Sequence, residues 1–448
     1  MMHAPLPLKS SKSGPLKGII RVPGDKSISH RSIMFGALAE GETIISGLLE
    51  GEDVFNTAQA MRALGAKVQK GDDGLFRCFG LGLGNLKEPN TILDMGNSGT
   101  STRLLMGILA SHNLTATFSG DASLNKRPMG RVTTPLEQMG AKFMGRAGGR
   151  LPLTMQGAYP AKSITYKLPV ASAQVKSAIL LAGLNAEGIT TVLEPEPTRD
   201  HSENMLRHFG IDVQISKNDE GIDAIKIEGG QKLLGCAVDV PSDPSSAAFP
   251  VVAALLNEGS ELTLTHVGIN PRRIGLYETL IEMGADIQFD NKTIDAGESV
   301  ATIIVRSKGP LKGIEVPPER VPSMIDEFPV LAMAAACAEG ITKMTGLAEL
   351  RVKESDRLQC VADGLIACGV KLEMGPDWLT IYGNGKPPKG GALIETQLDH
   401  RLAMSFLVLG SATELPVAVD DASPVNTSFP GFVELMNELG TDITEMQQ

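Results

Sequence analysis

Apolar and polar positions along the chain follow one pattern six times. In each copy an amphipathic helical stretch ends at a glycine and a β-rich stretch follows, as in MRALGAKV and LEQMGAKF. A glycine just after the last periodic residue is a typical helix stop. The six glycines lie 70 to 85 residues apart: Gly65, Gly140, Gly210, Gly284, Gly369 and Gly440. This near-constant period predicts six copies of one supersecondary unit.

A second helix is predicted ahead of each amphipathic one. These six stretches open with polar or charged residues and continue almost wholly apolar, as in ASAQVKSAILLAGL and DPSSAAFPVVAALL. A helix that is apolar all round is a buried helix. Several are followed by stretches such as ITTVLEP and SELTLTHV, which are typical of strands. The repeated unit is therefore mixed α/β, with a buried helix, an amphipathic helix and several strands.

Length and charge bound the function. A chain of 448 residues is expected to form two or three domains, and its 42% hydrophobic and 21% charged residues are ordinary for a globular protein. A net charge of −11 argues against a general nucleic-acid binder, which carries a basic surface. It leaves room for small anionic substrates, provided that the cations converge locally.

Other sequence features concern location and cofactors. No apolar stretch is long enough to span a membrane. Residues 1–18 lack an apolar signal core, and we expect them to form a frayed N-terminal tail. The five cysteines form no CxxC pair, and the seven histidines show no spacing such as HExxH. We therefore predict a cytoplasmic protein with free thiols, no metal site and no cofactor.

The polar starts of the buried helices are the candidate binding positions. Helix N-termini present unpaired N–H groups and partial positive charge, so they bind anions. Lys26 and Arg31 stand at the first such start, in GDKSISHR. Capping by Ser27, Ser172 or Asp326 would explain the serines and aspartates, but it explains the recurring Lys, Arg and Gln poorly. If the six starts face one cleft, that cleft is suited to several anionic groups.

Eight motifs resemble, in order along the chain, those of the 5-enolpyruvylshikimate-3-phosphate (EPSP) synthase family. They are GDKSISHR, GNSGTSTR, GDASLNKRPMGR, ASAQVKSA, DPSSAAFP, SMIDEFP, ELRVKESDR and LDHR. The resemblance covers essentially the whole chain. It implies transfer of the enolpyruvyl group of phosphoenolpyruvate to the 5-hydroxyl of shikimate 3-phosphate in the shikimate pathway, with release of phosphate.

The resemblance also implies an architecture. The enolpyruvyl transferase fold is α/β, with two similar domains of three βαβαββ units each and an interdomain cleft. Residues 24–240 would form the first domain, and residues 1–23 with 241–448 the second, so the chain crosses near Pro23-Gly24 and at Pro241. The N-terminal strand, within about residues 1–23, should then pack with the second domain. We expect a monomer that is inhibited by glyphosate.

The resemblance assigns substrate-binding residues. For shikimate 3-phosphate they are Lys26, Ser27, Arg31, Ser172, Ala173, Gln174, Asp326 and Lys353, with Arg199 as a further phosphate candidate. For phosphoenolpyruvate they are Lys26, Asn97, Gly99, Arg127, Gln174, Glu354, Arg357 and Arg401. Arginine suits this task because its planar fork grips carboxylate or phosphate with two hydrogen bonds. A plain loop position for Arg199 and a surface ion pair within KESDR are the alternatives.

The chemistry needs an acid and a base. Asp326 is the candidate base on the hydroxyl, and Lys26 and Glu354 are candidates for moving the proton at the enol; the sequence does not choose between these two. The spacing predicts that Lys353, Glu354 and Arg357 lie near one face of a helix capped by Ser355.

Two positions depart from the family pattern. Many members carry a lysine just before the Phe-Pro near the C-terminus, where this chain has Ser428, so one cationic contact to phosphoenolpyruvate is missing or replaced. The sequence most resembles a bacterial subgroup that includes glyphosate-tolerant enzymes, which have alanine at the position of Gly99. Because Gly99 lacks that methyl group, we predict a glyphosate-sensitive enzyme.

Two other functions compete. UDP-N-acetylglucosamine enolpyruvyl transferase shares the fold and the chemistry, but it typically carries a reactive cysteine in the loop that here spans residues 120–131 and contains none. A non-catalytic anion-binding relative would be expected to lose Asp326 or Glu354, and both are present.

Overall fold

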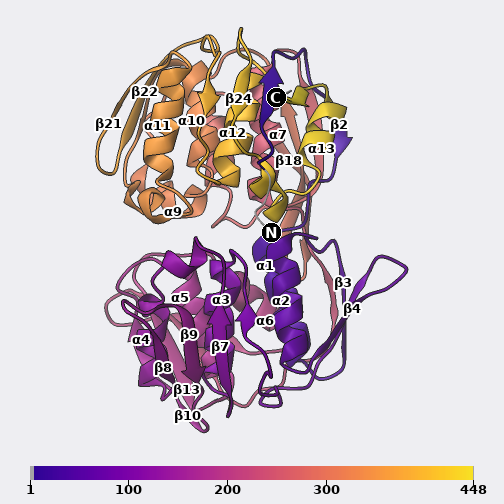
Figure 1. Cartoon of the computed structure of the whole chain (residues 1–448), viewed down its shortest axis with the longest axis vertical. Coiled ribbons are helices and arrows are strands. Elements are labelled where there is room, and N and C mark those ends of the chain that lie inside the picture. Colours follow the sequence, from indigo (N-terminus) through magenta and orange to yellow (C-terminus); the bar gives the residue numbers. More distant parts are fainter. Residues whose placement is uncertain (1–4, 447–448) are drawn as a thin grey trace. The chain divides into compact units, whose positions relative to one another are not determined.

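The computed structural model describes residues 5–446, which form two compact units (Figure 1). The central unit comprises Gly24–Val240 together with Ile294–Glu298. The terminal unit comprises the remaining described residues and so contains both ends of the described chain. Each unit has its own hydrophobic core. The segment Ile294–Glu298 lies within the stretch expected for the second domain, but it groups with the central unit, and Ala296 belongs to that unit's core.

Three four-stranded sheets with one connectivity form the framework of the central unit. In each sheet the first two strands pair in parallel and the later neighbours pair antiparallel. In spatial order they are β16 (Ala237–Asp239), β3 (Glu42–Ser46), β5 (Phe76–Phe79) and β4 (Lys67–Lys70); β6 (Leu93–Asp94), β7 (Thr115–Ser119), β9 (Arg150–Gln156) and β8 (Lys142–Arg146); and β11 (Thr165–Lys167), β13 (Ile189–Glu194), β15 (Asp223–Glu228) and β14 (Val213–Lys217). A short parallel pair, β10 (Ala161–Lys162) and β12 (Ala186–Glu187), completes the unit's strands.

The terminal unit repeats this plan. Its sheets are β2 (Lys17–Ile20), β17 (Glu261–Gly268), β19 (Glu298–Arg306) and β18 (Asp286–Asp295); β23 (Leu393–Ile394), β24 (Val417–Val419), β1 (Leu8–Ser11) and β25 (Asp442–Glu445); and β20 (Glu339–Met344), β22 (Leu379–Asn384) and β21 (Lys371–Met374). The expectation that residues 1–18 fray is wrong for the described part. Strand β1 pairs with β24 and β25, and β2 pairs with β17, so distant strands satisfy their backbone groups.

Two sets of six helices accompany the sheets. The buried set is α1 (Lys26–Leu38), α3 (Gly99–Leu109) and α5 (Ala173–Gly183) in the central unit, and α7 (Pro244–Leu256), α10 (Phe328–Cys337) and α12 (His400–Gly410) in the terminal unit. The amphipathic set is α2 (Glu52–Ala63), α4 (Gly130–Gln138), α6 (His201–His208), α8 (Gly275–Glu282), α11 (Arg357–Ala367) and α13 (Phe432–Leu439). Shorter elements are α9 (Val321–Met324) and the 3₁₀ turns η1 (Leu124–Lys126), η2 (Pro318–Arg320), η3 (Ala348–Val352) and η4 (Ser423–Thr427).

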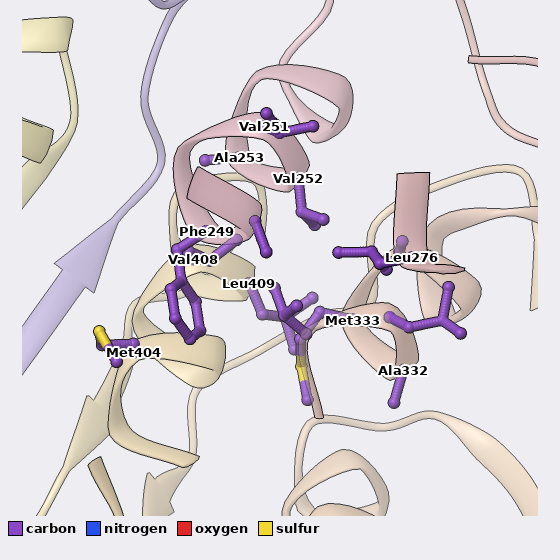
Figure 2. Packing of buried hydrophobic residues seen from close by; sticks show 14 of the residues in the cluster. Phe249, Val251, Val252, Ala253, Leu276, Ala332, Met333, Met404, Val408 and Leu409 are labelled. Atoms are coloured by element: carbon purple, nitrogen blue, oxygen red, sulfur yellow. The ribbon is translucent and has the colours of Figure 1, made fainter. Parts of the chain in front are cut away.

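The buried helices form the centre of each unit. In the central unit α3 and α5 lie against each other. In the terminal unit α7, α10 and α12 pack through apolar side chains, among them Phe249, Met333 and Val408 (Figure 2). The starts of these helices are therefore fixed by close-packed cores.

The repeat glycines bear out the sequence prediction of six units. All six have a positive φ, between 86° and 113°. Glycine adopts this left-handed backbone at no steric cost, so it ends the amphipathic helix and turns the chain into the next strand. The prediction of a mixed α/β chain built from six such units is confirmed.

Candidate active site

Most candidate binding residues of the central unit lie at starts of its buried helices. Lys26 and Ser27 open α1, and Gly99 opens α3 two residues after Asn97. Ser172 caps α5 by accepting from the Val175 amide, and Ala173 and Gln174 form the first turn. The capping role considered for Ser27 is wrong, because the Asp25 carboxylate accepts from the Ile28 amide at 2.9 Å instead.

Arg31 lies one turn into α1 and is held by neutral groups. Its Nε donates to the Ser202 hydroxyl at 2.8 Å, Nη2 donates to the Ser177 hydroxyl at 3.1 Å, and Nη1 donates to the Ser27 carbonyl at 2.9 Å. The side chain is buried. Burial lowers the pKa of the Arg31 guanidinium to about 10, although the Glu203 and Asp25 carboxylates oppose the shift. Arg31 therefore stays charged near neutral pH, and its partners orient that charge without neutralising it.

A second network joins the starts of α3 and α5. Arg103 Nη1 donates to Gln174 Oε1 at 2.6 Å, and Gln174 Nε2 donates to Thr100 Oγ1 at 3.0 Å. Nearby, Arg127 Nη2 donates to Asn97 Oδ1 at 3.0 Å. A Cβ atom built on Gly99 would lie 3.0 Å from Arg103 Nη1 and 3.3 Å from Arg127 Nη1. Gly99 thus lies directly against two guanidinium groups.

The start of α1 also contacts α2. Lys26 Nζ forms an ion pair with Asp53, which lies in the first turn of α2. One turn further along both helices, His30 Nδ1 and the Thr57 hydroxyl are 2.8 Å apart. Burial, followed by the charges of Lys26 and Arg31, lowers the pKa of His30 well below its ordinary value, so this histidine is neutral. It therefore adds no positive charge beside Lys26 and Arg31.

The candidate residues of the terminal unit gather around Arg357, which is buried. Arg357 Nε donates to Asp399 Oδ2 at 2.8 Å, Nη1 donates to Asp326 Oδ1 at 3.2 Å, and Nη2 donates to Glu354 Oε2 at 2.6 Å. Lys353 Nζ lies 3.2 Å from the same Asp326 oxygen. The candidate base and one candidate proton carrier are therefore held by one guanidinium.

Charge coupling is strong in this cluster. Burial would lower the pKa of Arg357, but the carboxylates, Asp399 first, raise it above its ordinary value. Burial would likewise raise the pKa of Asp399, and the Arg357 guanidinium outweighs that effect, so the pKa of Asp399 is below its usual range. Both groups are therefore ionised near neutral pH.

Arg401 belongs to a neighbouring network of the same unit. Its Nη1 donates to the Asp326 carbonyl at 3.1 Å and to Glu327 Oε1 at 3.3 Å. Glu327 also accepts from the Ser245 hydroxyl, and Ser245 in turn accepts from Arg273 Nη2 at 3.0 Å. A chain of buried polar groups thus runs from the start of α7 to Arg401.

Two sequence expectations about this region, the Ser355 cap and the shared helical face, are wrong, and so is the alternative of a cap at Asp326. Helix α11 is capped by Asp356, which accepts from the Gln359 amide at 3.1 Å, while Ser355 donates to Asp399. Lys353 and Glu354 precede the helix, so they do not share a helical face with Arg357. Asp326 is not the N-cap of α10, because Glu327 occupies that position; the Asp326 carboxylate instead accepts from the two cations.

Sequence reasoning missed three residues that touch the candidates. Asp399 anchors Arg357, Arg103 contacts Gln174, and Glu327 contacts Arg401. Asp399 stands in LDHR and Arg103 ends GNSGTSTR, so the motifs contained the signal, but only the fold brings them to partners on other helices.

Metal ligands, thiols and membrane-spanning helices were also considered in the sequence. Among residues 5–446, no group of three or more His, Cys, Asp or Glu side chains is arranged to hold a metal ion. All five cysteines are free thiols. In the same described range, no helix is long and apolar enough to cross a membrane.

Comparisons with known proteins agree over the whole chain. The family model for EPSP synthase (3-phosphoshikimate 1-carboxyvinyltransferase) matches residues 10–436. A 3-phosphoshikimate 1-carboxyvinyltransferase of Paramagnetospirillum magneticum is 60% identical over 438 residues, which cover 98% of either chain. One of Parvibaculum lavamentivorans is 57% identical, with coverage of 100% of this chain and 99% of the relative.

Solved structures give the same result. EPSP synthase from Acinetobacter baumannii superposes with a TM-score of 0.89 at 48% identity, covering 99% of this chain and 100% of that one. The enolpyruvyl transferase NikO from Streptomyces tendae, at 18% identity, has a TM-score of 0.77 over 99% of this chain and all of that one, which supports the shared fold. The chain belongs to the EPSP synthase family and has the enolpyruvyl transferase fold.

Proposed function

We propose that this protein transfers the enolpyruvyl group of phosphoenolpyruvate to the 5-hydroxyl of shikimate 3-phosphate. The observation that carries the proposal is the cluster around Arg357, where Asp326 and Glu354, the candidate base and a candidate proton carrier, contact one guanidinium. A non-catalytic relative would have no need of both carboxylates there. The full-length likeness to named 3-phosphoshikimate 1-carboxyvinyltransferases supports the same reaction.

The central unit, in this proposal, supplies most of the anion binding. Arg31 and Arg199, with Lys26, Ser27 and the start of α5 at Ser172, Ala173 and Gln174, hold shikimate 3-phosphate. Asn97, Gly99, Arg127 and Gln174 hold phosphoenolpyruvate. The argument is that the serine hydroxyls orient the Arg31 guanidinium and leave its positive charge available to an anionic ligand.

The terminal unit supplies the proton chemistry. Asp326 accepts the proton of the 5-hydroxyl, so its oxygen becomes a nucleophile, while Lys353 stabilises the ionised carboxylate. Glu354 or Lys26 delivers a proton to the methylene carbon of phosphoenolpyruvate, which makes C2 electrophilic. The 5-oxygen then attacks C2 to form a tetrahedral adduct. When the adduct collapses, its methyl group returns a proton to the protein, the carbon–carbon double bond re-forms, and the bond from C2 to the phosphate oxygen breaks, so that phosphate leaves. Arg357 and Arg401 bind phosphoenolpyruvate, so Arg357 exchanges part of its carboxylate contacts for the substrate.

Further expectations concern inhibition and cellular state. We expect glyphosate to inhibit the enzyme, because Gly99 leaves room beside Arg103 and Arg127. Ser428, whose hydroxyl is shielded and has no hydrogen-bond partner in the described part of the chain, replaces the lysine of many relatives and contributes no charge. We further propose a cytoplasmic monomer whose domains are residues 24–240 and residues 1–23 with 241–448.

A phosphate-release assay with two acceptors tests the function. The purified protein should release phosphate from phosphoenolpyruvate in the presence of shikimate 3-phosphate and not in the presence of UDP-N-acetylglucosamine. Asp363→Asn, an exposed change on α11, serves as an active control. Equal or faster release with the sugar nucleotide would overturn the assignment.

A further inference from the structure

The central unit contains three fully buried ionisable side chains for which the proposed reaction has no use. Lys176 lies on α5, Glu194 ends β13, and Glu203 lies in the first turn of α6. Lys176 Nζ is 2.9 Å from Glu194 Oε1 and 2.7 Å from Glu203 Oε1, and each side chain is at most 1% exposed. We call these three residues the Lys176 cluster.

Stability alone does not account for the Lys176 cluster. Lysine and glutamate are almost never fully buried unless they are paired, because desolvating a charge costs free energy that the ion pair only partly returns. Well-packed apolar residues of similar volume often serve a core as well or better. A buried ionic cluster can instead fix one arrangement of the elements that carry it, and this one joins α5, α6 and β13.

One set of contacts, which we call the first arm, links the Lys176 cluster to the loop that carries Arg199. Glu194 Oε1 accepts from the Thr198 amide at 3.0 Å and from the Thr198 hydroxyl. Lys176 Nζ also lies 3.5 Å from the Thr198 carbonyl oxygen. Residues 194–198 are therefore tied into a closed turn, and Arg199 follows directly.

A second set of contacts, which we call the second arm, links the Lys176 cluster to Arg31. Glu203 and Lys176 each have a serine as sequence neighbour, Ser202 and Ser177, and the Ser202 hydroxyl donates to the Ser177 hydroxyl at 2.8 Å. Both hydroxyls accept from Arg31. The ion pair between Lys176 and Glu203 thus fixes the distance between the two helices whose serines orient the guanidinium.

We propose that the Lys176 cluster positions Arg31 and Arg199 for the phosphate group of shikimate 3-phosphate. The inference rests on the proposed function, because it takes these two arginines as the phosphate ligands. Lys176, Glu194, Glu203 and Thr198 are positioning residues: they act through the arginines and do not touch the substrate.

Thr198→Val tests the first arm without leaving a charge uncompensated. The change keeps the side-chain shape and removes the hydroxyl that Glu194 accepts from. Because a hydrogen bond to a charged group is involved, the KM for shikimate 3-phosphate should rise about tenfold. The kcat, the KM for phosphoenolpyruvate and the inhibition constant of shikimate, which lacks the phosphate, should stay within about twofold.

Two matched variants control this result. Thr198→Ser keeps the hydroxyl and should restore the KM for shikimate 3-phosphate. Thr190→Val removes the hydroxyl of a buried threonine on β13, the strand that ends at Glu194. This hydroxyl has no hydrogen-bond partner in the described chain, so the change should leave every constant unchanged. A Thr198→Val enzyme with an unchanged KM for shikimate 3-phosphate, or with all constants shifted alike, would overturn the positioning role.

Glu203→Gln tests the second arm by the sign of its effect. The change removes a negative charge near the phosphate ligands, so an effect of charge alone would lower the KM for shikimate 3-phosphate. Positioning predicts the opposite, because the pair with Lys176 is weakened and α6 is less firmly held. A rise of about threefold to tenfold supports the proposal, whereas an unchanged or lower KM contradicts it.

Arg31→Lys separates this inference from the proposed function. If Arg31→Lys weakens shikimate 3-phosphate and Thr198→Val does not, the phosphate assignment stands and the positioning role is wrong. If Arg31→Lys leaves the KM for shikimate 3-phosphate unchanged, the phosphate assignment itself fails and the positioning role fails with it.

Discussion

Two buried site arginines, Arg31 in the central unit and Arg357 in the terminal unit, have different kinds of partner. Arg31 donates to two serine hydroxyls and a backbone carbonyl, and Arg103 and Arg127 donate to amide oxygens. Arg357 instead contacts the carboxylates of Asp399, Asp326 and Glu354. Carboxylate partners occur in the central unit as well, for Lys26 at Asp53 and for Lys176 at Glu194 and Glu203.

This difference separates binding from proton transfer. A hydroxyl or amide partner orients a guanidinium and leaves its positive charge uncompensated, which suits a phosphate or carboxylate ligand. A carboxylate partner compensates the charge but brings a group that can accept or deliver a proton. The two units share one architecture but surround Arg31 and Arg357 differently, so changes at Arg31 and changes at the carboxylates around Arg357 should affect different kinetic constants.

The largest effect is expected at Asp399, the most deeply placed carboxylate of the terminal unit. Asp399→Asn leaves buried Arg357 without its most deeply buried anionic partner, and breaking a buried ion pair typically costs about 3–5 kcal/mol of unfolding free energy. Urea denaturation at neutral pH measures this loss. Asp363→Asn, on the surface of the same unit, should change the unfolding free energy by less than about 0.5 kcal/mol.

Acidification should reduce the contribution of Asp399 to the unfolding free energy. Since the pKa of Asp399 in the folded protein is lowered, its contribution is fully present above the unfolded pKa of about 3.9 and is lost as the pH falls through the folded value. The stability difference between the original protein and Asp399→Asn should therefore shrink only below about pH 4. A difference that is already small at pH 7 would show that Asp399 does not anchor Arg357.

Asp326→Asn should lower kcat at least about 100-fold, as expected for the loss of a general base. Binding of shikimate 3-phosphate should survive, because asparagine keeps the shape and one oxygen acceptor for Lys353 and Arg357. Steady-state kinetics and calorimetric binding of shikimate 3-phosphate provide the two readouts. A kcat near that of the original protein would leave Asp326 with the structural task of holding two cations.

Arg31→Lys tests the binding role proposed for the central unit. Lysine keeps the charge but loses the fork that contacts Ser27, Ser177 and Ser202, so the KM for shikimate 3-phosphate should rise about 30-fold, while kcat at saturation changes little. Arg77→Lys, at a surface pair with Asp73 in the same unit, is the matched control. A fall in kcat without a change in KM would remove the proposed separation of binding from chemistry.

The fold was predictable because its signals are local and repeated. Six glycines at helix ends and six apolar helices lie within short stretches, and each follows from side-chain periodicity or from the left-handed backbone at the helix stop. The strand at Leu8–Ser11 carries no such signal, since its partners Val417–Val419 and Asp442–Glu445 lie more than 400 residues away. Its pairing depends on the whole fold.

The sequence predicted which residue types form the candidate site, but it predicted their helix caps and mutual contacts less well. Any Ser, Thr, Asp or Asn can cap a helix, so local sequence did not distinguish Asp25 from Ser27 or Asp356 from Ser355. The contact between Arg357 and Asp399 spans 42 residues, and that between Arg103 and Gln174 spans 71. Such partners become visible only when helices from different repeats are packed together.

The smallest expected effect, and the most selective, concerns Gly99 in the central unit. A methyl group there would lie 3.0 Å from Arg103 Nη1 and 3.3 Å from Arg127 Nη1. Both atoms are the ends of flexible side chains, which can shift by a few tenths of an ångström, so Gly99→Ala should fold and remain active. Glyphosate is longer than phosphoenolpyruvate, so it should tolerate the displaced arginine side chains less well.

Gly99→Ala should therefore raise the glyphosate inhibition constant about tenfold more than the KM for phosphoenolpyruvate, since a clash of this size corresponds to about 1–3 kcal/mol. The deciding quantity is the ratio of these two constants in both proteins. Gly130→Ala is the matched control, because a Cβ atom at Gly130 meets open space. If the ratio is already high in the original protein, or does not rise in Gly99→Ala, the two arginines beside Gly99 do not determine how strongly glyphosate inhibits the enzyme. In that case Arg357 and Arg401, the phosphoenolpyruvate ligands proposed in the terminal unit, would have to discriminate glyphosate from phosphoenolpyruvate.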